Sequence, residues 1–143
     1  RAIDKAYYKI QNMGLFDKLF NSSSEAIDKK ELHWIPLNSI KQLDEIRFKS
    51  RTKTQLIFKH STRCGISRMV MNQFTKDYGF SKNDFDLYYL DILNFRDISN
   101  EIAKAFEVWH ESPQLMIIKN GVVVAHASHS AISHLDLKTF VMN

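Results

Sequence analysis

The chain has 143 residues and one cysteine, Cys64, whose neighbours could support thiol chemistry. A lone cysteine cannot form an intramolecular disulfide, and in many proteins it is only a small core residue. Here Arg63 and Arg68 lie close to it in the sequence, and nearby cations favour the thiolate, which is the nucleophilic form. Lys59 or His60 could add further positive charge. Ser67 lies three positions after Cys64, where its hydroxyl could donate to the sulfur or simply pack in a helical turn. We therefore expect a reactive thiol.

The elements around Cys64 explain why its position matters. Residues 55–59 form an apolar run that predicts a buried strand, and residues 66–78 have a helical pattern that Gly79 would close. Cys64 then lies at the start of a helix, where unpaired backbone N–H groups and the helix dipole stabilise an anion. The position and the neighbouring charges both favour a thiolate.

A second feature, Ser112-Pro113, comes just before another predicted strand. Proline at the start of a strand can mark a sheet edge, and a trans peptide bond is the usual form. In proteins similar to thioredoxin the matching proline is cis and faces the active-site cysteine, and the residue before it pairs with extended substrates. The resemblance therefore implies a cis bond at Pro113.

The rest of the chain alternates between strand and helix patterns. Asn120-Gly121 joins two strands, because this pair supplies the positive φ angles of a tight turn. Asn38 or Ser39 can cap a helix that buries Ile40, Leu43 and Ile46. The remaining predicted elements are strands at 34–37 (an edge strand, from Pro36), 85–91, 115–119 and 122–126, and helices at 97–108 and 133–141.

The predicted order is β-α-β-α-β-α-β-β-α, which indicates an α/β fold with a mixed central sheet flanked by helices. This order is that of a thioredoxin-like fold. Residues 1–30 are interpreted as an N-terminal extension and linker, since Asn21-Ser22-Ser23-Ser24 is polar. Residues 31–143 are interpreted as the thioredoxin-like domain.

Composition excludes several classes of function. The net charge of +4 is spread along the chain, with no basic stripe of the kind that binds nucleic acid. There is no apolar run long enough to cross a membrane, and no secretory signal. A single cysteine favours a reducing compartment, so a cytoplasmic location is expected. His126, His129 and His134 have no Asp or Glu at ligand spacing, so no metal site or bound cofactor is expected, although His129 could border the thiol site.

Several segments resemble one family more closely. The chain from Met13 onward is similar to the YtxJ family of monothiol bacilliredoxins, and no single segment is decisive. The matching segments are Gly-Leu-Phe-Asp-Lys-Leu-Phe at 14–20, His60-Ser61-Thr62 before Cys64, Ile66-Ser67 after it, Ser112-Pro113, and His126-Ala127-Ser128-His129. Two departures are Gly65, where the family often has proline, and Phe58, where thioredoxins carry a buried aspartate.

The resemblance implies thiol–disulfide exchange that removes a small thiol, bacillithiol or a similar one, from protein mixed disulfides. Cys64 would be the catalytic residue. The substrate would be bound by Thr62, Arg63, Ser67, Ser112 and Pro113, and Arg68 or Lys59 could also hold its carboxylates. Bacillithiolated client proteins and a small-molecule thiol would be the partners, with the small thiol as co-substrate.

Two alternatives of other classes remain open. Cys64-Gly65-Ile66-Ser67 also resembles the Cys-Gly-Phe-Ser site of monothiol glutaredoxins, which carry iron–sulfur clusters. Against this class, Ala127-Ser128-His129 replaces the glutaredoxin Gly-Gly-Asp element. The third class is a non-catalytic binding module with an incidental cysteine. Replacing Cys64 with Ser separates exchange from the module, and replacing Ser67 with Ala is expected to leave activity largely intact.

Overall fold

The computed structural model describes residues 31–143, and within them the chain order of strands and helices follows the prediction closely. The predicted N-terminal extension and linker lie outside the described residues. The strands are β1 (Trp34–Pro36), β2 (Thr54–His60), β3 (Phe85–Asp91), β4 (Gln114–Lys119) and β5 (Val122–Ser128). The helices are α3 (Lys41–Lys49), α4 (Gly65–Asp77) and α5 (Arg96–Phe106), followed by the 3₁₀ helices η1 (His129–His134) and η2 (Leu137–Phe140).

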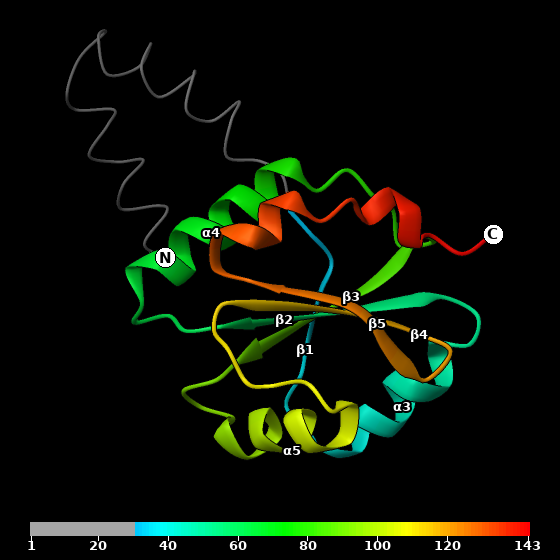
Figure 1. Cartoon of the computed structure of the whole chain (residues 1–143), viewed down its shortest axis with the longest axis horizontal. Helices are drawn as coiled ribbons and strands as arrows, with labels where there is room; N and C mark the ends of the chain where they lie inside the picture. The colour runs from blue at the N-terminus through cyan, green and yellow to red at the C-terminus, as the bar shows by residue number, and fades with distance from the viewer. Residues whose placement is uncertain (1–30) are drawn as a thin grey trace, which may run out of the picture. The chain divides into compact units, whose positions relative to one another are not determined.

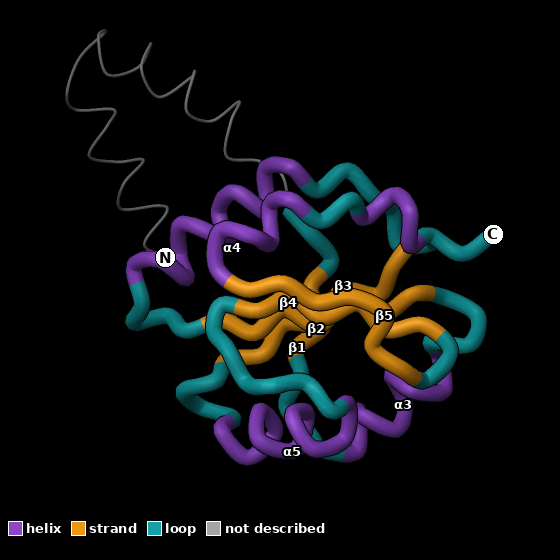
Figure 2. Tube along the Cα trace, viewed as in Figure 1, coloured by secondary structure: helices purple, strands orange, loops and turns teal. Residues whose placement is uncertain are grey.

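The five strands form one mixed sheet in the order β1-β3-β2-β4-β5. The strands β1, β2 and β3 run parallel, whereas β4 is antiparallel to β2 and to β5. Helix α4 and the two 3₁₀ helices cover one face of this sheet, and α3 and α5 cover the other (Figure 1). Figure 2 shows the strands as the middle layer between these two helical layers. The central strand β2 is therefore covered on both faces.

Each face of the sheet has its own apolar core. On the α3 and α5 side, Ile57 of β2 packs with Ile98 and Ile102 of α5. On the α4 side, Leu56 and Phe58 pack with Phe74. Successive side chains of a strand point to opposite faces, so the two cores alternate along β2. The alternation places Lys59 on the α5 side and His60 on the α4 side.

The first helix begins differently from the prediction. Ile40 is the residue before α3 and is 47% exposed, so only Leu43 and Ile46 of the predicted set are buried in α3. Ser39 caps the helix as expected, since its hydroxyl accepts the Lys41 N–H at 3.3 Å. In addition, the Gln42 side-chain oxygen accepts the Asn38 and Ser39 N–H groups, at 2.8 and 2.9 Å. A side chain within the helix therefore satisfies donors that precede it.

The C-terminal prediction was wrong in one element. A single helix over residues 133–141 is replaced by η1 and η2, separated by extended backbone at Leu135. Polar side chains bond backbone carbonyls three residues back, from Ser133 to Ser130 and from Thr139 to Asp136, each at 2.8 Å. Such local bonds compete with the α-helical ladder. At the end of α4, Gly79 also lacks the left-handed φ expected of a helix-closing glycine.

Candidate functional site

Cys64 lies at the junction between β2 and α4, as the sequence predicts. It is the residue before the first turn of α4, with extended backbone at φ −98° and ψ 121°. Its N–H donates to the Ser61 carbonyl at 3.2 Å, and its own carbonyl accepts the Arg68 N–H at 3.1 Å. The thiol is free and half-buried. The helix therefore presents its positive end to a sulfur that solvent can reach.

A buried polar network holds the loop that leads to Cys64. The Ser67 side chain is fully buried, and its oxygen accepts the Ser61 N–H at 3.1 Å. The same oxygen lies 3.0 Å from Nδ1 of His60, to which its proton can be donated. Burial lowers the pKa of His60, against an opposing effect of Asp91, and this favours the neutral, accepting imidazole. Ser67 thus fastens the loop, while its predicted contact with substrate stays a prediction.

The second predicted feature lies at the same end of the sheet. The Ser112–Pro113 peptide bond is cis, which confirms the prediction. Strand β4 begins at Gln114, which pairs with Lys59 near the end of β2, so Pro113 and the Cys64 loop lie at one edge. The Pro113 carbonyl accepts the His129 N–H at 3.0 Å. Roles for Ser112 and Pro113 in substrate binding stay predictions.

A hollow of about 390 Å³ adjoins the loop before Cys64. Its lining residues are Thr62, Arg63, Leu93 and Asn94. The neighbouring carboxylate, Asp91, faces its own loop, where it accepts the Leu93 N–H at 3.0 Å and the Asn94 amide at 2.7 Å. Within residues 31–143, no carboxylate forms an ion pair with Arg63. The hollow therefore contains the exposed side chain of the residue before Cys64, which has no ion-pair partner in this part of the chain.

Lys59 does not belong to this side of the site. Its side chain is fully buried on the α5 face of the sheet, with Nζ 3.3 Å from Nδ1 of His110. Burial lowers its pKa to about 8. The expectation that Lys59 could hold a substrate carboxylate is corrected, because solvent does not reach it. Because the residues around Lys59 form an apolar run, the sequence did not indicate to which face of the sheet the Lys59 side chain points.

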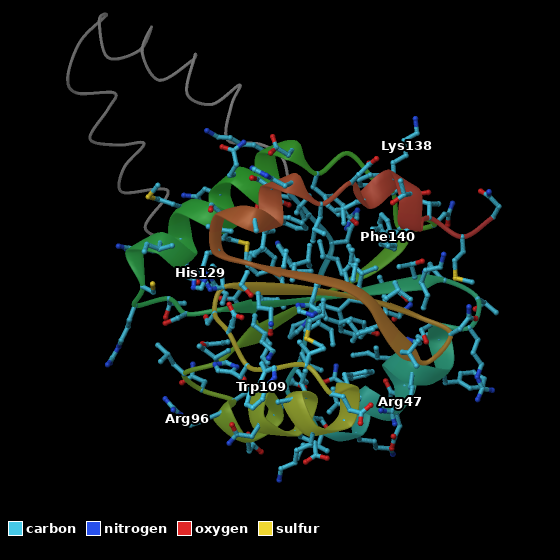
Figure 3. The ribbon with its side chains drawn as sticks, in the orientation of Figure 1. Arg47, Arg96, Trp109, His129, Lys138 and Phe140 are labelled. Carbon is cyan, nitrogen blue, oxygen red and sulfur yellow. The ribbon has the colours of Figure 1, made fainter. Side chains whose placement is uncertain are left out.

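His129 follows β5 and lies at the Cys64 end of the sheet. Its ring is 3.8 Å from the Glu111 carboxylate, and both side chains are about half exposed. Figure 3 shows His129 on the left of the view, opposite Lys138 and Phe140 on the right. The described part of the chain holds no group of three or more His, Cys, Asp or Glu placed to bind a metal, and no helix there is long and apolar enough to cross a membrane.

Comparison with known proteins agrees with this geometry. The family model of the monothiol bacilliredoxin BrxC matches residues 35–137, which include the Cys64 loop and the cis-proline loop. A solved thioredoxin-fold structure, proposed to be an oxidoreductase, is 35% identical with a TM-score of 0.62. The match covers 73% of this chain and 93% of that one.

Thioredoxins share the fold at lower identity. The thioredoxin of Malassezia sympodialis is 18% identical with a TM-score of 0.59, over 73% of this chain and 88% of that one. A thioredoxin of Schistosoma mansoni is 19% identical with a TM-score of 0.55, over 76% and 95% of the two chains. These likenesses establish the thioredoxin fold.

Proposed function

The chain belongs to the monothiol bacilliredoxin family, and we propose that Cys64 removes bacillithiol, or a similar anionic small thiol, from protein mixed disulfides. Thiol–disulfide exchange follows from the family and the fold. The observation that carries the finer proposal is a free, half-buried thiol at the start of α4, directly preceded in the chain by Arg63, which lines the hollow and has no ion pair among the described residues.

The proposed cycle needs one protein thiol. The Cys64 thiolate attacks the small-thiol sulfur of the mixed disulfide, and the client cysteine leaves as a thiolate that takes up a proton. Cys64 now holds the small thiol as a mixed disulfide. A second small thiol attacks that bound sulfur, frees the Cys64 thiolate and leaves as the small-molecule disulfide. Each turnover therefore consumes one free small thiol and yields the client thiol and one small-molecule disulfide, with no resolving cysteine.

The hollow beside Cys64 supports the choice of an anionic thiol. Arg63 supplies its cation, and Thr62 and Asn94 add polar groups to its lining. A guanidinium pairs well with a carboxylate, because both are planar and can form two parallel hydrogen bonds. We propose that Arg63 holds a carboxylate of the small thiol while its sulfur faces Cys64.

The test is release of bacillithiol from a bacillithiolated client, with the intact mass of the protein followed in parallel. Wild type should gain one reducible bacillithiol adduct, and Cys64→Ser should neither gain it nor release the small thiol. Arg63→Gln should slow regeneration by bacillithiol but not by the uncharged 2-mercaptoethanol. Arg51→Gln, at the far end of α3, is the matched control. Activity retained by Cys64→Ser, or an unreactive Cys64, would contradict the proposal and favour a non-catalytic module.

A further inference from the structure

Lys59 is a buried cation that the proposed exchange cycle does not use. Its side chain is fully buried, and neither ion pair in residues 31–143 includes it. A charge withdrawn from water without a counter-ion destabilises the fold, so its retention needs a reason. Its one hydrogen-bond partner among the described residues is Nδ1 of His110, at 3.3 Å.

His110 lies in the loop between α5 and β4 that ends at Ser112–Pro113. The loop begins at Glu107, which has a left-handed φ of 56°, and it ends where β4 starts at Gln114. Its two ends are buried at Val108 and Pro113, whereas Trp109 between them is 90% exposed and Glu111 is also exposed. The position of the middle of this loop therefore depends on polar contacts.

Three polar side chains from β2, β4 and α5 contact this loop. Lys59 contacts the His110 ring, and Ser99 of α5 contacts the same ring nitrogen at 3.1 Å. Gln114 donates from its amide to the Trp109 carbonyl at 3.0 Å. Lys59 and Gln114 are directly paired on neighbouring strands, so both contacts start from one point of the sheet. Gln114 bonds the backbone of the loop, whereas Lys59 contacts a side chain of the loop, that of His110.

We propose that Lys59 is a positioning residue, and that its contact with His110, the Lys59–His110 tether, fixes the loop that presents Ser112–Pro113 to the client protein. This inference rests on the proposed exchange function. The tether acts on the client side of the site, because Ser112–Pro113 lies at the sheet edge that carries Cys64. It acts on binding and leaves the chemistry of the thiol unchanged.

The charges of the pair suit this contact. Nδ1 can accept only when the ring is neutral, and burial together with Lys59 and Arg96 lowers the pKa of His110, against an opposing effect of Glu111. Lys59 can donate whether or not it is charged, and it is the stronger donor as an ammonium group. Near neutral pH the pair therefore combines a cationic donor with a neutral acceptor.

The experiment compares His110→Leu, which removes the acceptor, with His110→Asn, whose side-chain oxygen can occupy the place of Nδ1. His110 is exposed overall, and only the side of its ring that faces Lys59 and Ser99 is removed from water, so both variants should fold. Hydrogen–deuterium exchange of residues 107–113 measures the order of the loop. Steady-state exchange on a bacillithiolated client gives KM and kcat, and alkylation by iodoacetamide reports on Cys64. His33→Leu, an exposed histidine before β1, is the control.

We expect His110→Leu to raise the KM for the client and the hydrogen exchange of the loop about tenfold each, with kcat and alkylation unchanged. His110→Asn should restore both to near the wild-type values. A wild-type KM in His110→Leu, an equal defect in His110→Asn, or a parallel loss of alkylation would overturn the tether. Activity in Cys64→Ser would instead overturn the proposed exchange function, and hydrogen exchange would still show whether the tether orders the loop.

Discussion

At the scale of single residues, the site separates the group that reacts from the groups that hold it in place. Cys64 has a free thiol, whereas Ser67, three residues later, is buried and bound to Ser61 and His60. In the Cys-x-x-Cys sites that this segment resembles, the position of Ser67 is a second thiol. Here that position is part of the support of the loop, which fits a cycle that uses one thiol.

The buried hydroxyl of Ser67 can be tested by stability. Ser67→Ala leaves the Ser61 N–H without its acceptor, so the free energy of unfolding should fall by about 1–3 kcal/mol. Urea unfolding measures the loss, and Ser133→Ala, an exposed serine, is the control. Exchange by Cys64 should stay within a few-fold of wild type, since the hydroxyl is turned toward His60. A stable variant that has lost exchange would instead give Ser67 a direct role at the thiol.

Lys59 gives a prediction that depends on pH. Burial lowers its pKa from 10.5 to about 8, so below pH 8 the amine is charged in both the folded and the unfolded chain. Between pH 8 and 10.5 the unfolded chain binds more protons, and stability rises with pH. Lys59→Met should therefore stabilise the fold at pH 7, by at most on the order of 3 kcal/mol, and much less at pH 10.

Urea unfolding at both pH values measures this difference. Lys104→Met, an exposed position of α5, should give no such dependence on pH. An equal effect of Lys59→Met at pH 7 and pH 10 would mean that the buried charge is not its cause. Together with the tether, the expected result is a variant that is more stable and binds its client less well.

The sequence predicted part of the site, and physical reasons explain the rest. Cys64 and the cis bond at Pro113 follow from local patterns, because a strand–helix junction and a proline before a strand are both visible in one dimension. The face of the sheet to which the Lys59 side chain points could not be predicted, since β2 is buried on both faces and its apolar run does not alternate with polar residues. The His60–Ser67 contact depends on how α4 is rotated against β2, which spacing alone does not determine.

At the scale of elements, the strands and the helices α4 and α5 were predicted to within about two residues, and the C-terminal helix was not. The β4–β5 hairpin formed at Asn120-Gly121 with φ values of 51° and 82°, as the turn type requires. The predicted C-terminal helix did not form because the Ser133 and Thr139 hydroxyls donate to backbone carbonyls three residues back. Strand pairing is fixed by long apolar runs, whereas helix termini depend on single side chains.

The hairpin turn is held to the end of α3 by Ser50. Its hydroxyl accepts the Gly121 N–H at 2.8 Å and donates to the Arg47 carbonyl at 2.6 Å, while its carbonyl accepts the Asn120 N–H at 2.8 Å. Of these three bonds, Ser50→Ala keeps only the one from the Asn120 N–H, and the Gly121 N–H loses its acceptor. The free energy of unfolding should therefore fall by about 1–3 kcal/mol. Chemical denaturation measures the change, with the exposed Thr52→Ala as control. A loss below about 0.5 kcal/mol would mean that water replaces the hydroxyl.

At the scale of the whole domain, the sheet order explains why the site is where it is. Strand β2 lies between β3 and β4, so the loops that follow β2 and β3 and the loop that precedes β4 meet at one edge. These loops carry Cys64, the hollow at Arg63, and Ser112–Pro113. In the proposed cycle the small thiol would bind at Arg63 and the client at Ser112–Pro113, and because these lie on separate loops each can be changed separately.

The same arrangement separates an exchanger from an iron–sulfur carrier. One cysteine per chain supplies one of the four thiolates of a cluster, so two chains and two small thiols would have to combine. The loop after β5, which differs from the glutaredoxin element, instead places His129 against the Pro113 carbonyl and Glu111. Anaerobic reconstitution of the full chain with iron, sulfide and bacillithiol should therefore give no stoichiometric visible absorption. A glutaredoxin that binds a cluster serves as the positive control. A coloured dimer that requires both Cys64 and the small thiol would make cluster transfer the better account of this site.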